Sequence, residues 1–102
     1  MSIEELKELG WERGDSWNNR DFYYIGNSKY SIFEHNGEFG LEDVIAGGGF
    51  NFIYCDLTDD EIKEFTNLVK TSLNIESNPK DFTLHDYLDS QINLITFIKK
   101  RK

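Results

Sequence analysis

The sequence contains little of what secreted or membrane-spanning proteins need. Cys55 is its only cysteine, so no disulfide can form within the chain and nothing indicates an oxidising compartment. The first ten residues are polar and acidic and lack the apolar core of a secretion signal. The most apolar segment, residues 92–98, contains two polar residues and is too short to span a bilayer. We therefore expect a cytoplasmic protein that makes no use of a membrane.

Proline is also scarce, and no segment is repeated or of low complexity. Pro79 is the only proline in 102 residues, a length that predicts one domain covering residues 1–102. Aromatic residues make up 15% of the chain, and each can bury a large area. Disordered acidic segments are poor in aromatic residues, so the composition favours a compact core.

Basic residues are almost missing from residues 34–64. Lys63 stands there against nine acidic residues, which gives this range a formal charge of −8, equal to the net charge of the whole chain. Charge concentrated in this way produces a local field that attracts a basic partner. A solvated face that protects a sheet edge is the alternative explanation.

Three segments are predicted to be helices. Ser2 with Glu5 forms a capping box before a short helix over residues 3–9, and Thr58 with Glu61 forms another. After the second box, apolar residues recur at helical spacing over 62–73, and a loop is expected at 74–80. Thr83 caps the last helix. Its main buried stripe is expected at Leu84, Leu88, Ile92 and Ile95, widened by Tyr87, Leu94, Phe97 and Ile98.

Four aromatic segments between the first two helices are predicted to be strands. They cover residues 21–25, 29–35, 38–44 and 50–55. Asn36-Gly37 joins the second to the third, and this dipeptide favours a two-residue hairpin turn. The predicted fold is therefore α+β. A meander of three or four antiparallel strands, with one face open to water, carries the short N-terminal helix and two C-terminal helices packed on one face.

No motif in the sequence indicates catalysis, a metal site or a cofactor. Asp56, Asp59 and Asp60 lack the spacing of a calcium loop and are better explained as helix-capping residues. Gly47-Gly48-Gly49 precedes a strand instead of a helix, which does not suit a phosphate loop. Cys55 lies among apolar residues, where cysteine is usually inert, so pairing with His35 or His85 as nucleophile and base is disfavoured. We therefore expect that the protein is not an enzyme and binds no cofactor.

Residues 11–20 are rich in turn-forming residues, with a short strand possible at residues 11–13, and they offer two possible recognition features. Arg13-Gly14-Asp15 matches a tripeptide that integrins recognise, but such short matches are common and we interpret it as a turn. Trp17 lies in a polar segment, where it either covers the core or serves as an exposed anchor. Tyr23, Tyr24 and Tyr30 carry the same ambiguity, because helices are expected on only one face of the sheet.

These observations lead to a hypothesis of stoichiometric occlusion. A small acidic protein would occupy the basic groove of a nucleic-acid-processing enzyme or toxin, as a phage inhibitor of a CRISPR nuclease or an immunity protein would, without binding nucleic acid itself. The expected partner contacts are Glu34, Glu38, Glu42, Asp43, Asp59, Asp60 and Glu64, with Trp17 and Tyr24 as aromatic anchors.

Two other classes of function stay open. A structural or regulatory module could self-associate through a sheet edge or through the last helix, using Leu94, Phe97 and Ile98. An enzyme or small-ligand binder could use a cleft between sheet and helices, although no motif supports it. The sequence does not decide the oligomeric state.

Overall fold

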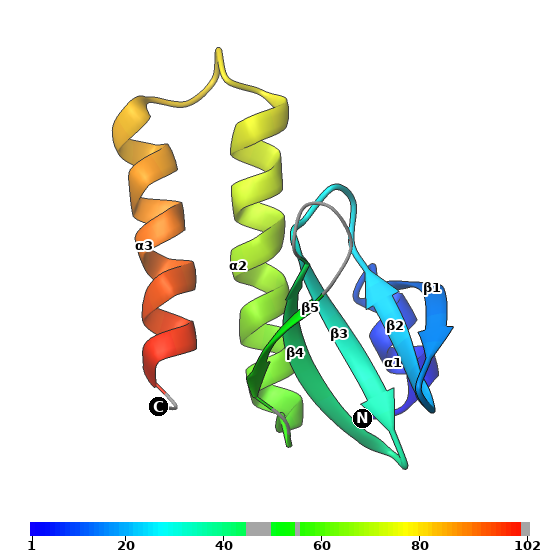
Figure 1. Cartoon of the computed structure of the whole chain (residues 1–102). Helices are drawn as coiled ribbons and strands as arrows, with labels where there is room; N and C mark the ends of the chain where they lie inside the picture. The colour runs from blue at the N-terminus through cyan, green and yellow to red at the C-terminus, as the bar shows by residue number, and fades with distance from the viewer. Residues whose placement is uncertain (45–49, 55, 101–102) are drawn as a thin grey trace. The chain divides into compact units, whose positions relative to one another are not determined.

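The computed structural model describes residues 1–44, 50–54 and 56–100. Figure 1 shows a short helix, an antiparallel meander and two longer helices. The elements are α1 (Ile3–Glu8), β1 (Glu12–Trp17), β2 (Arg20–Tyr24), β3 (Tyr30–His35), β4 (Glu38–Val44), β5 (Phe50–Tyr54), α2 (Asp59–Ser77) and α3 (Leu84–Lys100).

The predicted α+β class and the antiparallel meander are confirmed. The sheet has five strands in the order β1-β2-β3-β4-β5, one more than the largest number predicted. The additional strand, β1, contains the Arg13-Gly14-Asp15 tripeptide, so its interpretation as a turn was wrong. The register of β1 against β2 shifts between Arg13 and Ser16, and this irregularity weakens the alternation that marks a strand in a sequence.

The chain divides into two compact units, and each is described by itself. The first, Met1–Glu61, contains α1 and the sheet, and the second, Ile62–Lys102, contains most of α2 and all of α3. The expectation that residues 1–102 form one domain stays a prediction.

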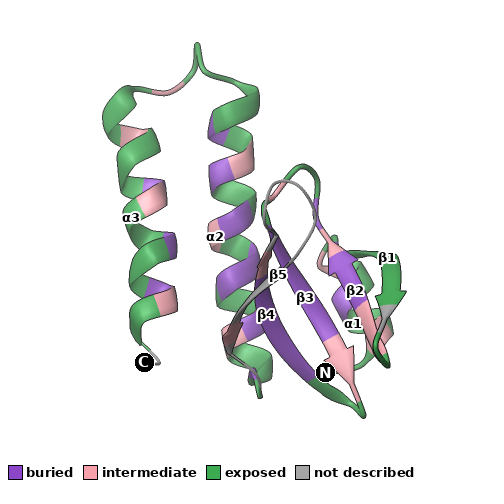
Figure 2. Ribbon diagram, viewed as in Figure 1, coloured by how far each residue is buried: buried purple, intermediate pink, exposed green. Residues whose placement is uncertain are grey.

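Both faces of the sheet are closed to water at its centre (Figure 2). One row across β2, β3 and β4 consists of Tyr23, Ile32 and Leu41, each at most 2% exposed. The adjacent row, Phe22, Phe33 and Gly40, points to the opposite face and is also buried. The expectation of one wet face was therefore wrong. On this second face β4 contributes only Glu38, Gly40 and Glu42. The aromatic residues Phe22 of β2 and Phe33 of β3 lie on the same face.

Gly40 is required by this packing. A Cβ atom at position 40 would collide with the ring of Phe33 on the neighbouring strand. The absence of a side chain at Gly40 thus lets the Phe33 ring approach the backbone of β4 closely. A glycine inside a strand often marks such a close approach.

The second unit is a pair of helices joined by residues 78–83. The rings of Phe65 in α2 and Phe97 in α3 lie 5.2 Å apart, and Gln91 donates a hydrogen bond of 2.8 Å to Ser72 Oγ. The predicted loop at 74–80 begins too early, because α2 continues to Ser77. Asn78 ends the helix with backbone and side-chain hydrogen bonds to the carbonyl oxygen of Asn74, so the helix needs no glycine there.

The stripe predicted to bury α3 was on the wrong face. Leu94 and Phe97, expected only to widen it, are 3% and 5% exposed. The residues of the predicted main stripe are exposed instead. They are Leu84 at 73%, Leu88 at 48%, Ile92 at 57% and Ile95 at 48%.

Candidate functional site

The acidic residues of β4 and its hairpin do not share one surface. Successive residues of a strand point to opposite faces, so Glu38 and Glu42 lie on one face of the sheet while Glu34 and Asp43 lie on the other. Glu38 opposes His35 across the strands, and Glu34 opposes Phe39. Glu34 and Glu38 are therefore not paired across the strands and lie on opposite faces of the sheet.

Glu34 has a local structural role. Its Oε1 accepts a hydrogen bond of 2.7 Å from the backbone N–H of Gly37, in the turn between β3 and β4. Gly37 has φ of +82° and Asn36 has φ of +52°, as the turn requires. The carboxylate satisfies a turn amide, and this explains an acidic residue before the turn without a partner protein.

Glu42 is not a surface residue, which corrects its assignment as a partner contact. It is 2% exposed, and its Oε1 accepts a hydrogen bond of 3.0 Å from the Nη1 of Arg20. Burial raises the pKa of Glu42, and the charge and hydrogen bond of Arg20 oppose that rise. A carboxylate enclosed in the sheet cannot contact a basic groove.

Glu42 belongs to a row of polar residues that crosses three strands. Tyr24, Ser31 and Glu42 face one another across β2, β3 and β4. The Oγ of Ser31 and the Oε2 of Glu42 are both buried, and among the described residues neither has a hydrogen-bond partner. Unpaired buried polar atoms cost stability, so this row makes the centre of the sheet sensitive to protonation and substitution.

Glu38, Asp59 and Asp60, three of the other predicted contacts, lie toward one end of the first unit, whereas Asp43 is half-buried and pairs with Tyr30 at the far end of β4. The backbone N–H of Leu57 donates to the carbonyl oxygen of Phe39 at 2.9 Å, which brings the segment before α2 next to the start of β4, where Glu38 lies. The Met1 ammonium group donates to Asp59 Oδ1 at 2.7 Å, which brings the start of α1 to the start of α2. We define the acidic end as the exposed residues Glu4, Glu38, Asp56, Asp59 and Asp60.

The whole first unit shares this charge. Residues 1–61 contain fourteen acidic and four basic residues, a formal charge of −10, whereas residues 62–102 contain five acidic and seven basic residues, a charge of +2. Three of the four basic side chains in the first unit are engaged locally. Arg13 pairs with Asp21, Arg20 pairs with Glu42, and the Lys29 Nζ lies 5.2 Å from the centre of the Tyr30 ring.

Counting charge along the sequence missed part of this surface. Six further acidic residues of the first unit precede the window that the sequence singled out, and five of them are exposed. The exposed residues are Glu4, Glu5, Glu8, Glu12 and Asp15. A charge count over all residues before Ile62, the first apolar residue of the predicted amphipathic helix, would have included these residues.

The two aromatic anchors have different outcomes. Trp17 is the last residue of β1, and its side chain lies outside the described part of the structure. Tyr24 is half-buried, and its ring packs against Gly14. A Cβ atom added to Gly14 would lie only 2.5 Å from the Cε2 atom of this ring. Tyr23 and Tyr30 are 2% and 7% exposed, so neither can anchor a partner. Tyr24 is thus a packing residue with one accessible side.

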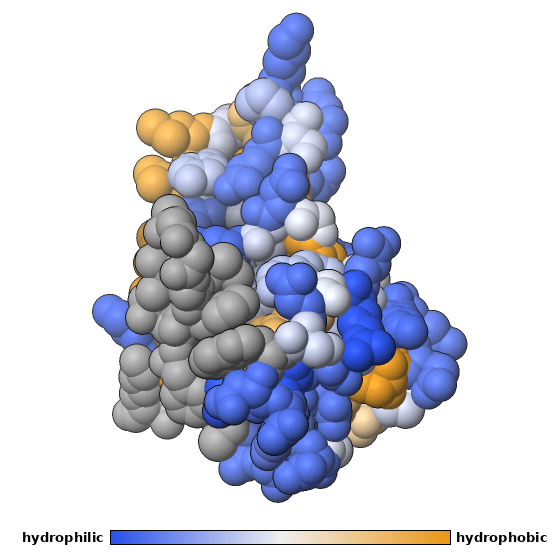
Figure 3. Space-filling view, turned by 45° about the vertical axis from the view of Figure 1, so that its right-hand side comes forward, coloured by the Kyte–Doolittle hydropathy of each residue, from blue (hydrophilic) through white to orange (hydrophobic). Residues whose placement is uncertain are grey.

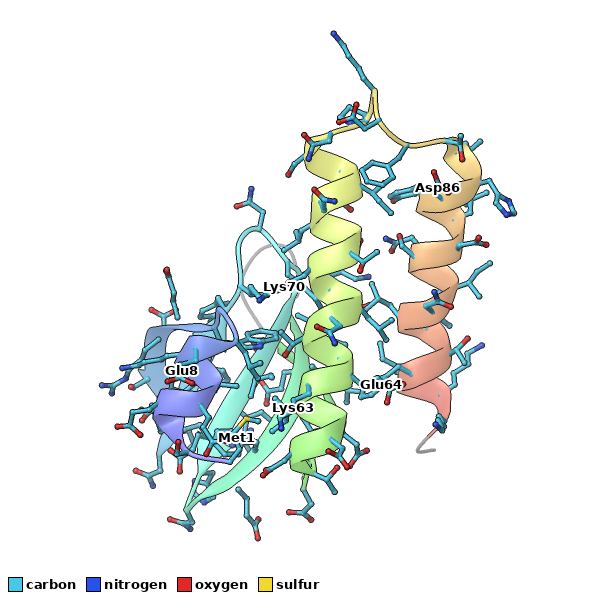
Figure 4. The ribbon with its side chains drawn as sticks, turned by 180° about the vertical axis from the view of Figure 1, so that it is seen from behind. Met1, Glu8, Lys63, Glu64, Lys70 and Asp86 are labelled. Carbon is cyan, nitrogen blue, oxygen red and sulfur yellow. The ribbon has the colours of Figure 1, made fainter. Side chains whose placement is uncertain are left out.

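Glu64, the last predicted contact, lies in the second unit. It is exposed on α2, four residues after Asp60 and hence on the same side of that helix. Figure 4 shows Lys63 and Lys70 on another side of α2. Thr58 and Glu61 form the predicted capping box at its start, with hydrogen bonds of 3.0 and 3.2 Å.

Apolar side chains gather on the outer face of α3. The positions 84, 88, 92 and 95 recur every three or four residues and form one exposed stripe, on the side of α3 away from Leu94 and Phe97. In the space-filling view, hydrophobic side chains project at the upper left, whereas most of the remaining described surface is hydrophilic (Figure 3). The suggestion of self-association through Leu94 and Phe97 was wrong, because both residues are buried.

The structure also bears on the expectations about metal binding and membrane insertion. Among residues 1–44, 50–54 and 56–100, no three His, Cys, Asp or Glu side chains come together as a metal site requires. No helix in the same ranges has the length and apolar character needed to cross a membrane. Gly47, Gly48, Gly49 and Cys55 lie outside the described residues.

Comparison with known proteins identifies no relative. No family model, no curated protein and no solved structure matches the chain.

Proposed function

We propose that this protein is a small cytoplasmic inhibitor that binds a basic protein partner through the acidic end. The observation that carries the proposal is the separation of charge, −10 in residues 1–61 against +2 in residues 62–102. Arg13 and Arg20, which could neutralise that field, are held in ion pairs inside the unit. A field of one sign steers an oppositely charged protein and raises its rate of association.

The target class follows from the chemistry of the acidic end. Proteins that process nucleic acids bind phosphates with clusters of lysine and arginine. Carboxylates on a folded surface can occupy the same cluster, so binding would exclude the nucleic acid one for one. A phage inhibitor of a defence nuclease, such as an anti-CRISPR protein, and an immunity protein for a nuclease toxin both act in this way. Direct binding to nucleic acid is disfavoured, because the chain itself carries a charge of −8.

The contact set differs from the one that the sequence suggests. Glu38, Asp59 and Asp60 keep their assignment, and Glu4 and Asp56 join them because they lie at the same end. Glu42 leaves the set because it is buried.

Capture from a bacterial lysate at low salt tests the proposal. The test variant is Glu38→Lys with Asp60→Lys. The matched control is Glu76→Lys with Asp81→Lys, which makes the same charge change on exposed residues of the second unit. We expect the wild type and the control to retain a basic protein that elutes as salt rises and is displaced by duplex DNA, while the test variant loses it.

Two results would contradict the proposal. A partner retained equally by the test variant would place its binding site away from the acidic end. A partner that duplex DNA does not displace would not be a nucleic-acid-binding protein. Circular dichroism of the two variants checks that both remain folded.

A further inference from the structure

The apolar stripe on α3 has a different chemistry from the acidic end. It consists of Leu84, Leu88, Ile92 and Ile95, which are between 48% and 73% exposed. Single exposed aliphatic residues are ordinary, but four on one helix face form a continuous apolar surface of the kind found at interaction sites.

α3 cannot bury this stripe by rotating within its own unit. Its opposite face is occupied by Leu94 and Phe97, and Phe97 packs 5.2 Å from Phe65. Gln91 also holds α3 to α2 through its hydrogen bond to Ser72. Within the described residues of the second unit, α3 therefore has two apolar faces while only α2 packs against it, a pattern that predicts a second helix on the outside.

We infer that the occupant of this stripe is the α3 helix of a second copy of the chain, in antiparallel orientation. The charges along α3 are self-complementary only in that orientation. Asp86 and Asp89 lie in its first two turns, where Asp86 also accepts a hydrogen bond from the Thr83 N–H and Asp89 lies 3.2 Å from His85, and Lys99 and Lys100 lie in its last turn. An antiparallel pair places the acidic start of each helix against the basic end of the other, and the helix dipoles favour the same arrangement.

The charge of the second unit permits such a pair. Residues 62–102 carry only +2, so two such units repel each other weakly, whereas two first units at −10 repel each other strongly. A parallel pair would bring the two lysine ends together. The stripe comprises four side chains on one helix, whereas stable complexes bury about 800 Å² per partner, so we expect the dimer to dissociate on dilution.

This inference is independent of the acidic end, and its first test is the oligomeric state. Sedimentation of the full chain from about 10 µM to about 1 mM covers the range of weak dimers. The test variant is Leu88→Gln with Ile92→Gln. The control is Asn93→Gln with Thr96→Gln, which alters exposed polar residues of the same helix. We expect the wild type and the control to dimerise and the test variant to dimerise at least about tenfold more weakly.

A second test addresses orientation, in a Cys55→Ser background. A Leu84→Cys chain is mixed with a Lys99→Cys chain under oxidising conditions. An antiparallel pair brings these positions together and gives a mixed disulfide. A parallel pair links only identical chains, because the two positions lie about 22 Å apart along one helix.

Each contrary result has a definite meaning. A wild type that stays monomeric overturns the inference, and a lower melting temperature of the Leu88→Gln, Ile92→Gln variant would then show that the stripe is covered within its own chain. Dimers that both variants retain overturn it too, because the interface would lie elsewhere, such as at the β1 or β5 edge of the sheet. Disulfides between identical chains alone would exclude the antiparallel pair.

Discussion

Arg20 reaches Glu42 across an intervening strand. Arg20 begins β2 and Glu42 lies in β4, and the guanidinium carbon passes 4.8 Å from the centre of the Phe33 ring on β3. The hydrogen bond at the end of this path is 3.0 Å long, and its two side chains are 34% and 3% exposed. One side chain thus combines a cation–π contact with a partly buried ion pair and ties three strands together.

Removal of the Glu42 carboxylate should destabilise the first unit. We expect Glu42→Ala to lower the free energy of unfolding by about 1–3 kcal/mol, because it leaves a space and deprives Arg20 of its acceptor. Glu42→Gln keeps an oxygen acceptor and adds an N–H₂ group beside Ser31, so its cost should stay within about 1 kcal/mol. Urea unfolding measures both, and equal costs would show that the acceptor for Arg20 contributes nothing.

The same carboxylate should make stability depend on pH. Burial raises the pKa of Glu42 in the folded chain, so between its unfolded and folded values the folded state binds more protons. Glu42 therefore contributes stability below its unfolded pKa, and this contribution is lost as pH rises through the folded pKa. Relative to Glu42→Gln, the wild type should gain stability from pH 7 to pH 4. A difference that shrinks in that direction would mean that Arg20 outweighs burial.

Local signals in the sequence predicted most of the elements correctly. The box of Ser2 with Glu5 begins α1, and Thr83 exchanges hydrogen bonds of 2.9 and 3.1 Å with Asp86 before α3. Asn36-Gly37 joins β3 to β4 as predicted. In each case the interacting groups lie within three residues, so the pattern contains the whole interaction.

Features that depend on distant residues were not predictable in this way. On the polar face of β4, the Phe33 ring packs on Gly40 and Arg20 pairs with Glu42, and neither Phe33 nor Arg20 is near Glu42 in the sequence. The apolar residues of α3 occupy two faces, and periodicity alone does not say which face meets α2. The acidic end joins residues near both limits of the first unit, as the pair of Met1 and Asp59 shows, and a count along the chain separates them.

A methyl group at position 40 should disrupt the sheet more than one at position 37. Gly40→Ala would push against the Phe33 ring and should cost about 1–3 kcal/mol. Gly37 has no atom within 4 Å of a new Cβ, so Gly37→Ala should cost only about 1 kcal/mol of backbone strain at φ +82°. Thermal unfolding compares the two. Phe33→Leu should recover part of the loss at position 40 and none at position 37.

The ionisation of Asp21 should depend more on a serine than on an arginine. The Ser16 hydroxyl donates to Asp21 Oδ1 at 2.7 Å, and Arg13 donates to the same oxygen at 3.2 Å. The hydrogen bond from Ser16 is the largest of the effects that hold the pKa of Asp21 below its usual value. We expect Ser16→Ala to raise this pKa more than Arg13→Gln does, as followed by NMR titration of the carboxyl carbon. The reverse order would show that charge, instead of the hydroxyl, controls the site.

In dilute solution, where copies of the chain stay apart, truncation on the buried face of α3 should cost much more stability than truncation on its exposed face. Leu94 is 3% exposed, so Leu94→Ala should lower the free energy of unfolding by about 2–4 kcal/mol. Ile92 is 57% exposed, so Ile92→Ala should change it by no more than about 0.5 kcal/mol, since little apolar surface returns to water. Urea unfolding followed by circular dichroism measures both variants. If truncation of Ile92 cost as much as truncation of Leu94, its side chain would already be covered within one chain, and the stripe would not be free to bind a second copy.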